Sequence, residues 1–224
     1  GYGIIIQKVK QLQLIQAKGI SHSFDYELFK NIDFELNSSK SIAIIGKSGS
    51  GKSTLLHILS SFLKPKSGSV VLIGKNISKL NESEIDKMRR FDIGMIFQFH
   101  HLFKGMKAKE NIEISSMLSN TKIDEKIMKL LEIDSLMEQK TSELSGGQQQ
   151  RISIARVLAK KPKIIFADEP AGNLDKETAI LVMKALKNYI KEENAGLILV
   201  THDKDVASMC DEVYELEDQK LSIL

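Results

Sequence analysis

The feature that most constrains the fold of this chain is a glycine-rich segment, GKSGSGKS, at residues 46–53. An apolar run precedes it at residues 42–45, and the largely apolar sequence LLHIL follows at residues 55–59. The pattern G-x-x-x-x-G-K-[S/T] in this context is typical of a loop that joins a buried strand to a helix and wraps around phosphate groups. Glycines let backbone N–H groups point inward, and the start of the helix adds partial positive charge. We therefore expect an α/β protein that binds a phosphorylated ligand.

The last residues of this segment have distinct expected roles. Lys52 is expected to contact the β- and γ-phosphates of a nucleotide, and Ser53 to ligate magnesium. The alternative is a glycine-rich turn without function, but a chance match in a chain of this length is on the order of one in a hundred. The candidate nucleotide-binding residues of the loop are Gly46, Lys47, Ser48, Gly49, Ser50, Gly51, Lys52, Ser53 and Thr54.

Two acids end a second apolar run, KIIFADE, at residues 163–169. A strand that ends in a carboxylate close to a phosphate-binding loop places that carboxylate near the magnesium ion. Asp168 is expected to hold the metal through water, and Glu169 to polarise the attacking water and accept its proton. Two acids at a strand end can also be ordinary surface carboxylates, and the phosphate-binding loop upstream favours the functional interpretation.

Kinases, GTPases and transport ATPases can all contain such a loop and strand, and the segment LSGGQ at residues 144–148 distinguishes among them. This pentapeptide resembles the signature of the ABC ATPase family, and the resemblance covers nearly the whole chain from Leu12. It implies an α/β fold, a P-loop ABC-ATPase core with a mixed sheet, an antiparallel β subdomain and an inserted helical subdomain. It also implies binding of ATP and Mg²⁺ and hydrolysis of ATP to ADP and phosphate.

The resemblance gives roles to residues that would be ambiguous alone. Gln98 has the position of the family's Q-loop glutamine, and His202 that of its switch histidine. Phe24 is implied to stack on adenine, and Tyr26 is the less favoured candidate. Without the resemblance, Gln98 would be interpreted as a surface amide, His202 as a structural histidine and Phe24 as a core aromatic. The implied catalytic residues are Lys52, Gln98, Glu169 and His202; the implied metal ligands are Ser53, Gln98 and Asp168; and the D-loop contains Asn173, Leu174 and Asp175.

The remaining histidines match no hydrolytic element of the family. By default they are expected to be structural or to lie on the surface: His22, His57, His100 and His101.

The signature segment also has a physical interpretation of its own. Two glycines at the start of a helix expose backbone N–H groups, and a serine adds a hydroxyl, which makes a second anion site. The resemblance implies that two chains pack head to tail as a homodimer on ATP binding, so that the loop of one and the signature of the other enclose the same ATP. The residues implied to contact ATP across this dimer are Leu144, Ser145, Gly146, Gly147 and Gln148.

Hydrophobic periodicity predicts the elements around these motifs. Continuous apolar runs at residues 42–45, 164–166 and 197–200 have the length of strands buried on both faces, which favours a parallel sheet. Alternating apolar residues predict antiparallel strands around Ile32, Phe34 and Leu36 and at residues 70–73. Helical spacing is found at Ile180, Met183, Leu186 and Ile190, after Asp175 as a possible N-cap, and at Ile152, Ala155 and Leu158.

These elements suggest one ABC ATPase domain spanning residues 1–224. Residues 12–98 and 162–224 are expected to form the nucleotide-binding α/β core. Helix-like patterns dominate residues 99–161, which are interpreted as the inserted helical subdomain that contains the signature.

Bulk properties exclude several classes of partner. The formal net charge of +3 in 224 residues is too small and dispersed to indicate nucleic acid or direct binding to a membrane surface. No run approaches the roughly 18 apolar residues of a membrane-spanning helix, and residues 1–10 lack the apolar core of a signal peptide. The single cysteine, Cys210, fits a reducing compartment. The family resemblance, and not these bulk properties, implies a location at the cytoplasmic face of the bacterial inner membrane, with membrane association only through a partner.

The segment FQFHHLF, residues 97–103, looks like that of the LolD-type ATPases of the lipoprotein-releasing system. These form a branch with MacB-like exporters and FtsE-like cell-division ATPases, and the segments PAGNLD and THD fit the whole branch. The resemblance implies LolC/LolE-like integral membrane partners and release of lipoproteins. A MacB-like exporter and an FtsE-like regulator remain alternatives.

Two other classes agree less well with the sequence. A P-loop phosphotransferase or GTPase would leave the signature unexplained, and no guanine-reading Asn-Lys-x-Asp motif is found. A chromosome or repair ATPase of the ABC type would contain long coiled-coil heptads, which are absent from the sequence.

Overall fold

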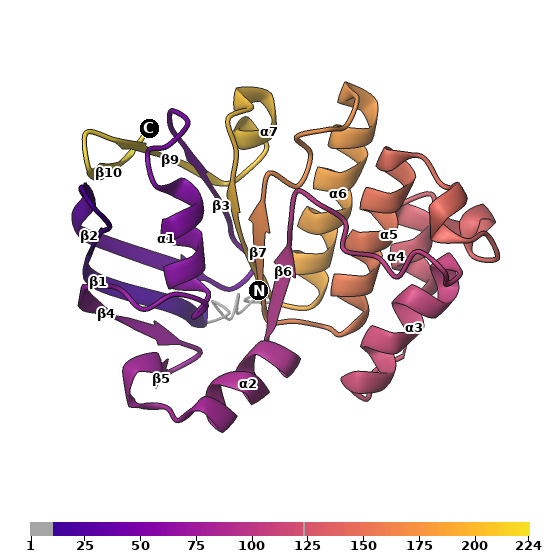
Figure 1. Ribbon diagram of the computed structural model, residues 1–224, viewed down its shortest axis with the longest axis horizontal. Helices are drawn as coiled ribbons and strands as arrows, with labels where there is room; N and C mark the ends of the chain where they lie inside the picture. Colours follow the sequence, from indigo (N-terminus) through magenta and orange to yellow (C-terminus); the bar gives the residue numbers. More distant parts are fainter. Residues whose placement is uncertain (1–10, 123) are drawn as a thin grey trace, which may run out of the picture.

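A mixed six-stranded sheet forms the centre of the computed structural model, which describes residues 11–122 and 124–224 (Figure 1). The strand order is β10-β9-β3-β8-β7-β6, in which β10 pairs antiparallel with β9 and the other pairs are parallel. The strands are β3 (Ser41–Ile45), β6 (Ile93–Ile96), β7 (Ile164–Asp168), β8 (Gly196–Val200), β9 (Glu212–Glu217) and β10 (Lys220–Ile223). The predicted apolar strands at residues 42–45, 164–166 and 197–200 are confirmed as parallel neighbours.

Both faces of the sheet are buried at β3, β7 and β8, which explains why these strands are continuously apolar. In β3, Ala43 and Ile45 pack into one hydrophobic cluster, whereas Ile42 and Ile44 pack into a second. Successive side chains of a strand point to opposite faces, so the two clusters lie on the two sides of the sheet. Helices must then cover both sides, as is usual for parallel strands.

Helices α5 and α6 belong to the first cluster and α1 to the second, and Figure 1 shows α1 on one side of the sheet and α5 and α6 on the other. The N-cap of α6 is Asp175, whose carboxylate accepts a hydrogen bond from the backbone N–H of Thr178 (3.0 Å), as predicted. The helices are α1 (Lys52–Leu59), α2 (Glu82–Phe91), α3 (Ala108–Leu118), α4 (Glu125–Leu130), α5 (Gly146–Ala159), α6 (Lys176–Glu192) and α7 (Lys204–Ser208). Short 3-10 turns are η1 (Ile77–Lys79), η2 (Asp134–Leu136) and η3 (Thr141–Glu143).

A second, antiparallel sheet has the order β2-β1-β4-β5 and packs with α1 in the second cluster. Its strands are β1 (Gln13–Ser23), β2 (Glu27–Asn37), β4 (Ser67–Leu72) and β5 (Lys75–Asn76). The alternation around Ile32, Phe34 and Leu36 falls in β2, where all three side chains are buried. The antiparallel part of the predicted mixed architecture is therefore confirmed.

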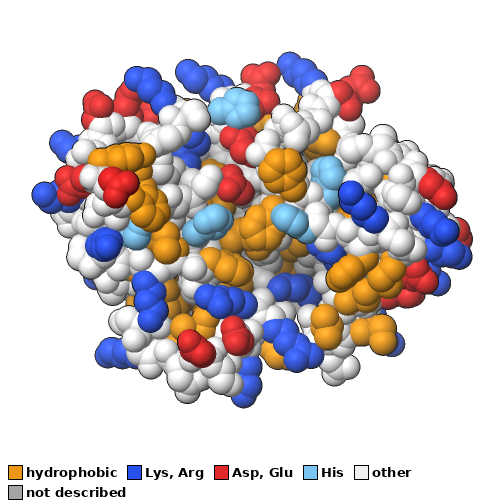
Figure 2. Space-filling model, viewed as in Figure 1, with side chains coloured by type: hydrophobic (Ala, Val, Ile, Leu, Met, Phe, Trp, Pro, Cys, Tyr) orange, Lys and Arg blue, Asp and Glu red, His pale blue; other side chains and the backbone are white. Residues whose placement is uncertain are grey.

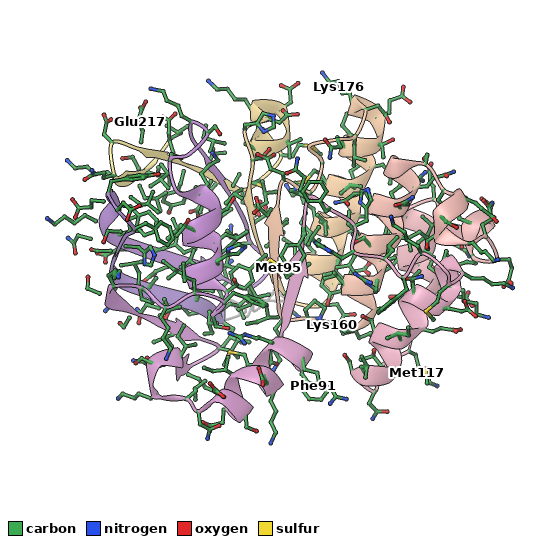
Figure 3. The ribbon with its side chains drawn as sticks, viewed as in Figure 1. Phe91, Met95, Met117, Lys160, Lys176 and Glu217 are labelled. Carbon is green, nitrogen blue, oxygen red and sulfur yellow. The ribbon has the colours of Figure 1, made fainter. Side chains whose placement is uncertain are left out.

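Helices α3, α4 and α5 occupy the segment between β6 and β7 and lie together at one end of the molecule (Figure 1). Cationic side chains attach this end to the core: Lys160 donates to the carbonyl of Arg89 at the end of α2 (2.8 Å), and Arg90 donates to the carbonyl of Leu118 at the end of α3. Figure 3 shows Lys160 above Phe91, with Met117 to their right, in the lower part of the molecule. Lysine and arginine at helix C-termini satisfy carbonyls that the helices leave unpaired.

The sequence patterns do not predict β1 or β6. In β6 the apolar run is interrupted by Gly94, where an added Cβ would lie 2.7 Å from Val157 and 2.9 Å from Pro162. The close approach of α5 to the strand therefore explains why residue 94 is a glycine. Because this glycine interrupts the apolar run at residues 93–96, the run looks too short for a buried strand.

In the described part of the chain, no helix is both long enough and apolar enough to cross a membrane. The expectation for a signal peptide concerned residues 1–10, which lie outside that part.

Candidate nucleotide-binding site

A cleft of about 410 Å³ lies at the carboxyl ends of the parallel strands, next to the start of α1. It brings together half of the predicted site residues, and its lining comes from five separate segments of the chain. In Figure 2, hydrophobic and histidine side chains gather over the middle of this face, where β6 and β7 end. The lining residues are Phe24, Tyr26, Leu28, Ser48, Gly49, Gly51, Lys52, Ser53, Thr54, Gln98, Asp168, Glu169 and His202.

The glycine-rich loop takes a conformation that only small residues allow. Gly51 is the N-cap of α1 with φ +98, and an added Cβ would lie 3.1 Å from the Phe29 ring. A Cβ on Gly46 would lie 2.5 Å from the carbonyl oxygen of Leu216 at the end of β9. The loop is thus packed between β2 and β9, and the N–H groups at the start of α1 remain available to an anion.

The loop also holds its own lysine. Lys52 donates to the carbonyl oxygens of Gly46 (2.8 Å) and Lys47 (2.9 Å). Burial lowers the pKa of Lys52, and the Glu169 and Asp168 carboxylates oppose this effect. An ammonium group held by two carbonyls at the mouth of an anion site is placed to move onto phosphate oxygens.

Ser53 and Asp168 form a pair of oxygen ligands for a hard cation. The Ser53 hydroxyl donates to the Asp168 carboxylate (3.2 Å), and burial raises the pKa of Asp168. No cluster of three or more histidine, cysteine or acidic side chains able to hold a metal is found among residues 11–122 and 124–224. Magnesium typically uses one or two carboxylates together with substrate phosphates. This donor pair therefore fits Mg²⁺ that arrives with a nucleotide.

Glu169 is held in a defined orientation by residues at the end of β8. It accepts hydrogen bonds from the Thr201 hydroxyl (2.9 Å), the His202 backbone N–H (3.0 Å) and His202 Nδ1 (2.8 Å). A carboxylate only accepts, so Nδ1 of His202 carries the hydrogen and Nε2 is left for another contact. The backbone of Glu169 has φ +47, a left-handed conformation that costs energy for a residue with a side chain. Glu169 and His202 are therefore held together by two hydrogen bonds.

The aromatic residues that were candidates for adenine stacking line the same cleft. Phe24 is 61% exposed and Tyr26 64%, so both rings are free to stack. The Phe24 and His22 rings form a T-shaped pair, with 4.9 Å between their centroids. His22 is buried beneath it, which agrees with the structural role expected for this histidine.

The signature and the D-loop lie outside this cleft in the described chain, next to each other. Ser145 is the N-cap of α5 and forms a capping box with Gln148: its hydroxyl accepts from the Gln148 N–H (3.2 Å), and its own N–H donates to the Gln148 side chain (2.9 Å). A Cβ on Gly147 would lie 3.6 Å from Leu174 of the D-loop. The second anion surface expected from the sequence would thus be the first turn of α5.

Comparison with known proteins gives the family of this site. Residues 29–172 match the family described as ABC transporter. The chain is an ABC transporter ATPase. It is 39% identical over 201 residues to the lipoprotein-releasing system ATP-binding protein LolD of Legionella pneumophila, covering 87% of this chain and 88% of the relative. It is 36% identical to the macrolide export ATP-binding/permease protein MacB of Wolinella succinogenes, covering 95% of this chain and 34% of the relative.

Solved ABC structures share the fold. The dimeric bacterial ABC transporter cassette MJ0796 superposes with a TM-score of 0.82 at 31% identity, covering 93% of this chain and 97% of that one. A post-hydrolysis dimer of the same cassette, bound to ADP and Pi, gives a TM-score of 0.83 at 31% identity, covering 93% and 97% of the two chains. The predicted P-loop ABC-ATPase fold and the predicted nucleotide hydrolysis are confirmed at the level of the family.

The sequence motifs do not include a group of α5 residues whose side chains contact the backbone of the segments that line this ABC site. Gln150, two residues after the signature, is buried and contacts the segments that follow both Phe97 and Glu169. Arg156, also on α5, donates to the carbonyl oxygens of His100 and His101. Their partners lie 20 to 56 residues away in the sequence. No local pattern could have shown these contacts, although Gln150 and Arg156 interrupt the apolar face of α5.

Proposed function

We propose that this ABC ATPase binds ATP with Mg²⁺, hydrolyses it as a homodimer, and drives a separate integral membrane partner that releases lipoproteins from the bacterial inner membrane. The observation that carries the catalytic part is the convergence of Lys52, Ser53, Asp168 and the Glu169–His202 pair on one cleft. The cargo rests on the LolD relatives.

In the proposed reaction the loop N–H groups bind the phosphates, Lys52 leaves its carbonyl partners for the β- and γ-phosphates, and Phe24 stacks on adenine. Ser53, Asp168 and Gln98 would hold Mg²⁺, which neutralises phosphate charge when bound. Glu169 accepts the proton of the attacking water. His202, whose Nδ1 is committed to Glu169, is left with Nε2 to contact the γ-phosphate.

The separation of the two proposed anion surfaces supports the homodimer. The first turn of α5 lies outside the cleft that contains Lys52 and Ser53, so one chain would offer two phosphate-binding surfaces to different ligands. A second copy packed head to tail would place its residues 144–148 on the ATP bound by the first. The dimeric cassette MJ0796, which has the same fold, supports this assembly.

The membrane partner is proposed to dock near Gln98. Three phenylalanines flank it in sequence and are solvent exposed, Phe97 by 37%, Phe99 by 70% and Phe103 by 53%. Leu102 packs against the core and anchors the segment. So much apolar surface in one segment suits contact with another protein. LolC/LolE-like subunits would provide a short helix there, and the chain would then lie at the cytoplasmic face of the membrane.

The test is reconstitution. The chain is purified with the membrane proteins encoded with it, and the complex is placed in proteoliposomes that contain a lipoprotein. ATP-dependent release of the lipoprotein into solution is expected. Macrolide transport without lipoprotein release would support the MacB-like alternative. Co-purification of a single four-helix partner without any transport would support the FtsE-like alternative. Either result would reject lipoproteins as the cargo and leave the ATPase mechanism intact.

A further inference from the structure

Gln150 connects three parts of the ATPase that lie far apart in the sequence. It is on the second turn of α5, the signature helix, and is 2% exposed. Its amide nitrogen donates to the carbonyl oxygen of Pro170 (3.0 Å) and, at longer range, to that of Phe97 (3.4 Å). Pro170 follows Glu169 directly, and Phe97 precedes Gln98. One buried side chain of the signature helix therefore contacts both the segment of the proposed base and the segment of the proposed docking surface.

His100 makes the remaining hydrogen bond of this side chain. Its Nδ1 lies 2.6 Å from Oε1 of Gln150. Because the amide nitrogen faces two carbonyl oxygens, it must be the donor there, and Oε1 is left to accept. His100 must then carry its hydrogen on Nδ1, and a flipped amide would place two acceptors against each other at Pro170. The two carbonyls thus determine both the amide orientation and the imidazole tautomer.

The backbone around His100 is attached to the same helix. Arg156 donates to the carbonyl oxygens of His101 (2.9 Å) and His100 (3.4 Å), and burial lowers the pKa of its guanidinium. Phe97 and Phe99 remain exposed on either side of Gln98. A partner that binds these rings would therefore move the segment of residues 97–103. Within the described chain, His100 is the only residue of this segment whose side chain is hydrogen-bonded to Gln150.

On the other side of Gln150, the contact with Pro170 supports a strained turn. Glu169 has a left-handed backbone, and the N–H of Gly172 donates back to its carbonyl oxygen (3.1 Å). A Cβ on Gly172 would lie 3.4 Å from the Cβ of Glu169, so the turn is tight. Strained backbone of this kind persists only where neighbouring contacts hold it.

We infer that His100 is a positioning residue for hydrolysis: through Gln150 and Pro170 it sets the turn that orients Glu169, and so transmits the state of the docking segment to the base. This inference rests on the proposed role of Glu169. His100 touches neither nucleotide nor water in this arrangement; it acts through the amide. The bond adds a specific function to a histidine that no hydrolytic motif includes.

The kinetic test compares two replacements at one position. His100→Leu removes the donor, and we expect kcat for ATP hydrolysis to fall about 10- to 100-fold, as for a misplaced catalytic group, with KM for ATP unchanged. His100→Asn keeps an N–H donor at the δ position and should restore most of the activity. The matched control is His101→Asn, which removes the adjacent, exposed imidazole and tolerates the left-handed backbone (φ +47).

A double-mutant cycle identifies the route. Gln150→Met keeps the length of the side chain but removes all three hydrogen bonds. If the relay runs through Gln150, adding His100→Leu to Gln150→Met should cause no further loss of kcat. Independent, multiplying losses would overturn the relay and leave His100 with a merely local role.

An NMR measurement tests the bond without reference to activity. In the ¹⁵N-histidine-labelled protein at about pH 8, above the usual pKa of histidine, the His100 imidazole should be protonated on Nδ1 and not on Nε2. The Nε2–H tautomer would overturn the inference. If the wild-type chain hydrolyses ATP and His100→Leu has the same kcat, only the inferred relay from His100 to Glu169 fails. If the wild type does not hydrolyse ATP, the proposed function fails and the relay with it.

Discussion

At the scale of residues, the site depends on two neighbouring carboxylates that have different environments. Asp168 ends β7, accepts from the Ser53 hydroxyl, and has a pKa raised by burial. Glu169 has turned out of the strand, and its two oxygens accept three hydrogen bonds from Thr201 and His202. A carboxylate beside the loop serine suits a cation, and a carboxylate fixed next to an imidazole suits a proton acceptor. One step along the chain therefore separates the two roles.

Replacement of the second carboxylate tests this division. Glu169→Gln can keep one oxygen for the two His202 hydrogen bonds and places an amide NH₂ at the Thr201 hydroxyl, but it cannot accept a proton. We expect kcat to fall about 10²- to 10⁴-fold, the usual contribution of general base catalysis, with ATP affinity preserved. The ATP-bound dimer should accumulate, which size-exclusion chromatography with ATP and Mg²⁺ would detect. Glu125→Gln on the exposed start of α4 is the control; a strictly monomeric Glu169→Gln with normal turnover would contradict both roles.

The loop lysine gives a second prediction at this scale. Lys52→Ala removes the ammonium group that now sits on the carbonyls of Gly46 and Lys47. We expect hydrolysis to be abolished and the affinity for a fluorescent ATP analogue to fall at least tenfold, because two charge-assisted contacts are lost. The melting temperature should change little, since the site is at the surface. Lys64→Ala, in the loop after α1, is the control, and wild-type phosphate release by Lys52→Ala would remove this loop from the mechanism.

The chemistry of the site could be predicted from the sequence because each motif is local. The loop around Lys52 and the acids after residue 167 have fixed spacing within a few residues. The hydrogen bond from His100 to Gln150 spans 50 positions and depends on how α5 packs against β6. Only the folded chain brings such residues together, so a histidine treated by default as structural or on the surface is found at a junction of three segments.

At the scale of elements, the packing of α5 on β6 sets the distance between the signature helix and the sheet. Gly94→Ala would place a methyl group 2.7 Å from Val157 and 2.9 Å from Pro162. Overpacking of this kind costs about 1–3 kcal/mol, which urea unfolding should show as a lower midpoint. Gly105→Ala is the control, because its Cβ would meet no atom within 4 Å. Unchanged stability of Gly94→Ala would mean that α5 can shift away from the sheet.

The fold could be predicted where periodicity was strong and uninterrupted. The runs that became β3, β7 and β8 are buried on both faces, and their apolar character is continuous. Helix α6 has regular apolar spacing after a capping aspartate. The pattern failed at β6, because the requirement for a glycine at the contact with α5 broke the apolar run. A tertiary contact therefore removed the local signal for the strand.

At the scale of the whole molecule, the two proposed anion surfaces are on separate elements, and the exposed Phe97, Phe99 and Phe103 lie between them in the sequence. Gln98 lines the nucleotide cleft, whereas Phe97 and Phe99 on either side of it are open to solvent. The segment is attached to the signature helix through Arg156 and Gln150. A partner that binds these rings would therefore be connected through hydrogen bonds to both proposed nucleotide-binding surfaces, as the proposed ATP-driven movement of a membrane subunit requires.

The last prediction tests that connection. Phe99→Asp places a charge in the middle of the proposed docking surface, where a partner helix would have to desolvate it. Phe99 is 70% exposed, so the substitution should leave the melting temperature within a few degrees of the wild type. We expect the membrane subunits to stop co-purifying with the chain, and ATP-dependent release of lipoprotein from proteoliposomes to be lost.

The matched control is Ile223→Asp, on β10 and 61% exposed, which should keep both the co-purification and the release. Full release by Phe99→Asp would place the docking surface elsewhere on the molecule, and loss of release by both variants would show that an added surface charge alone disrupts the complex.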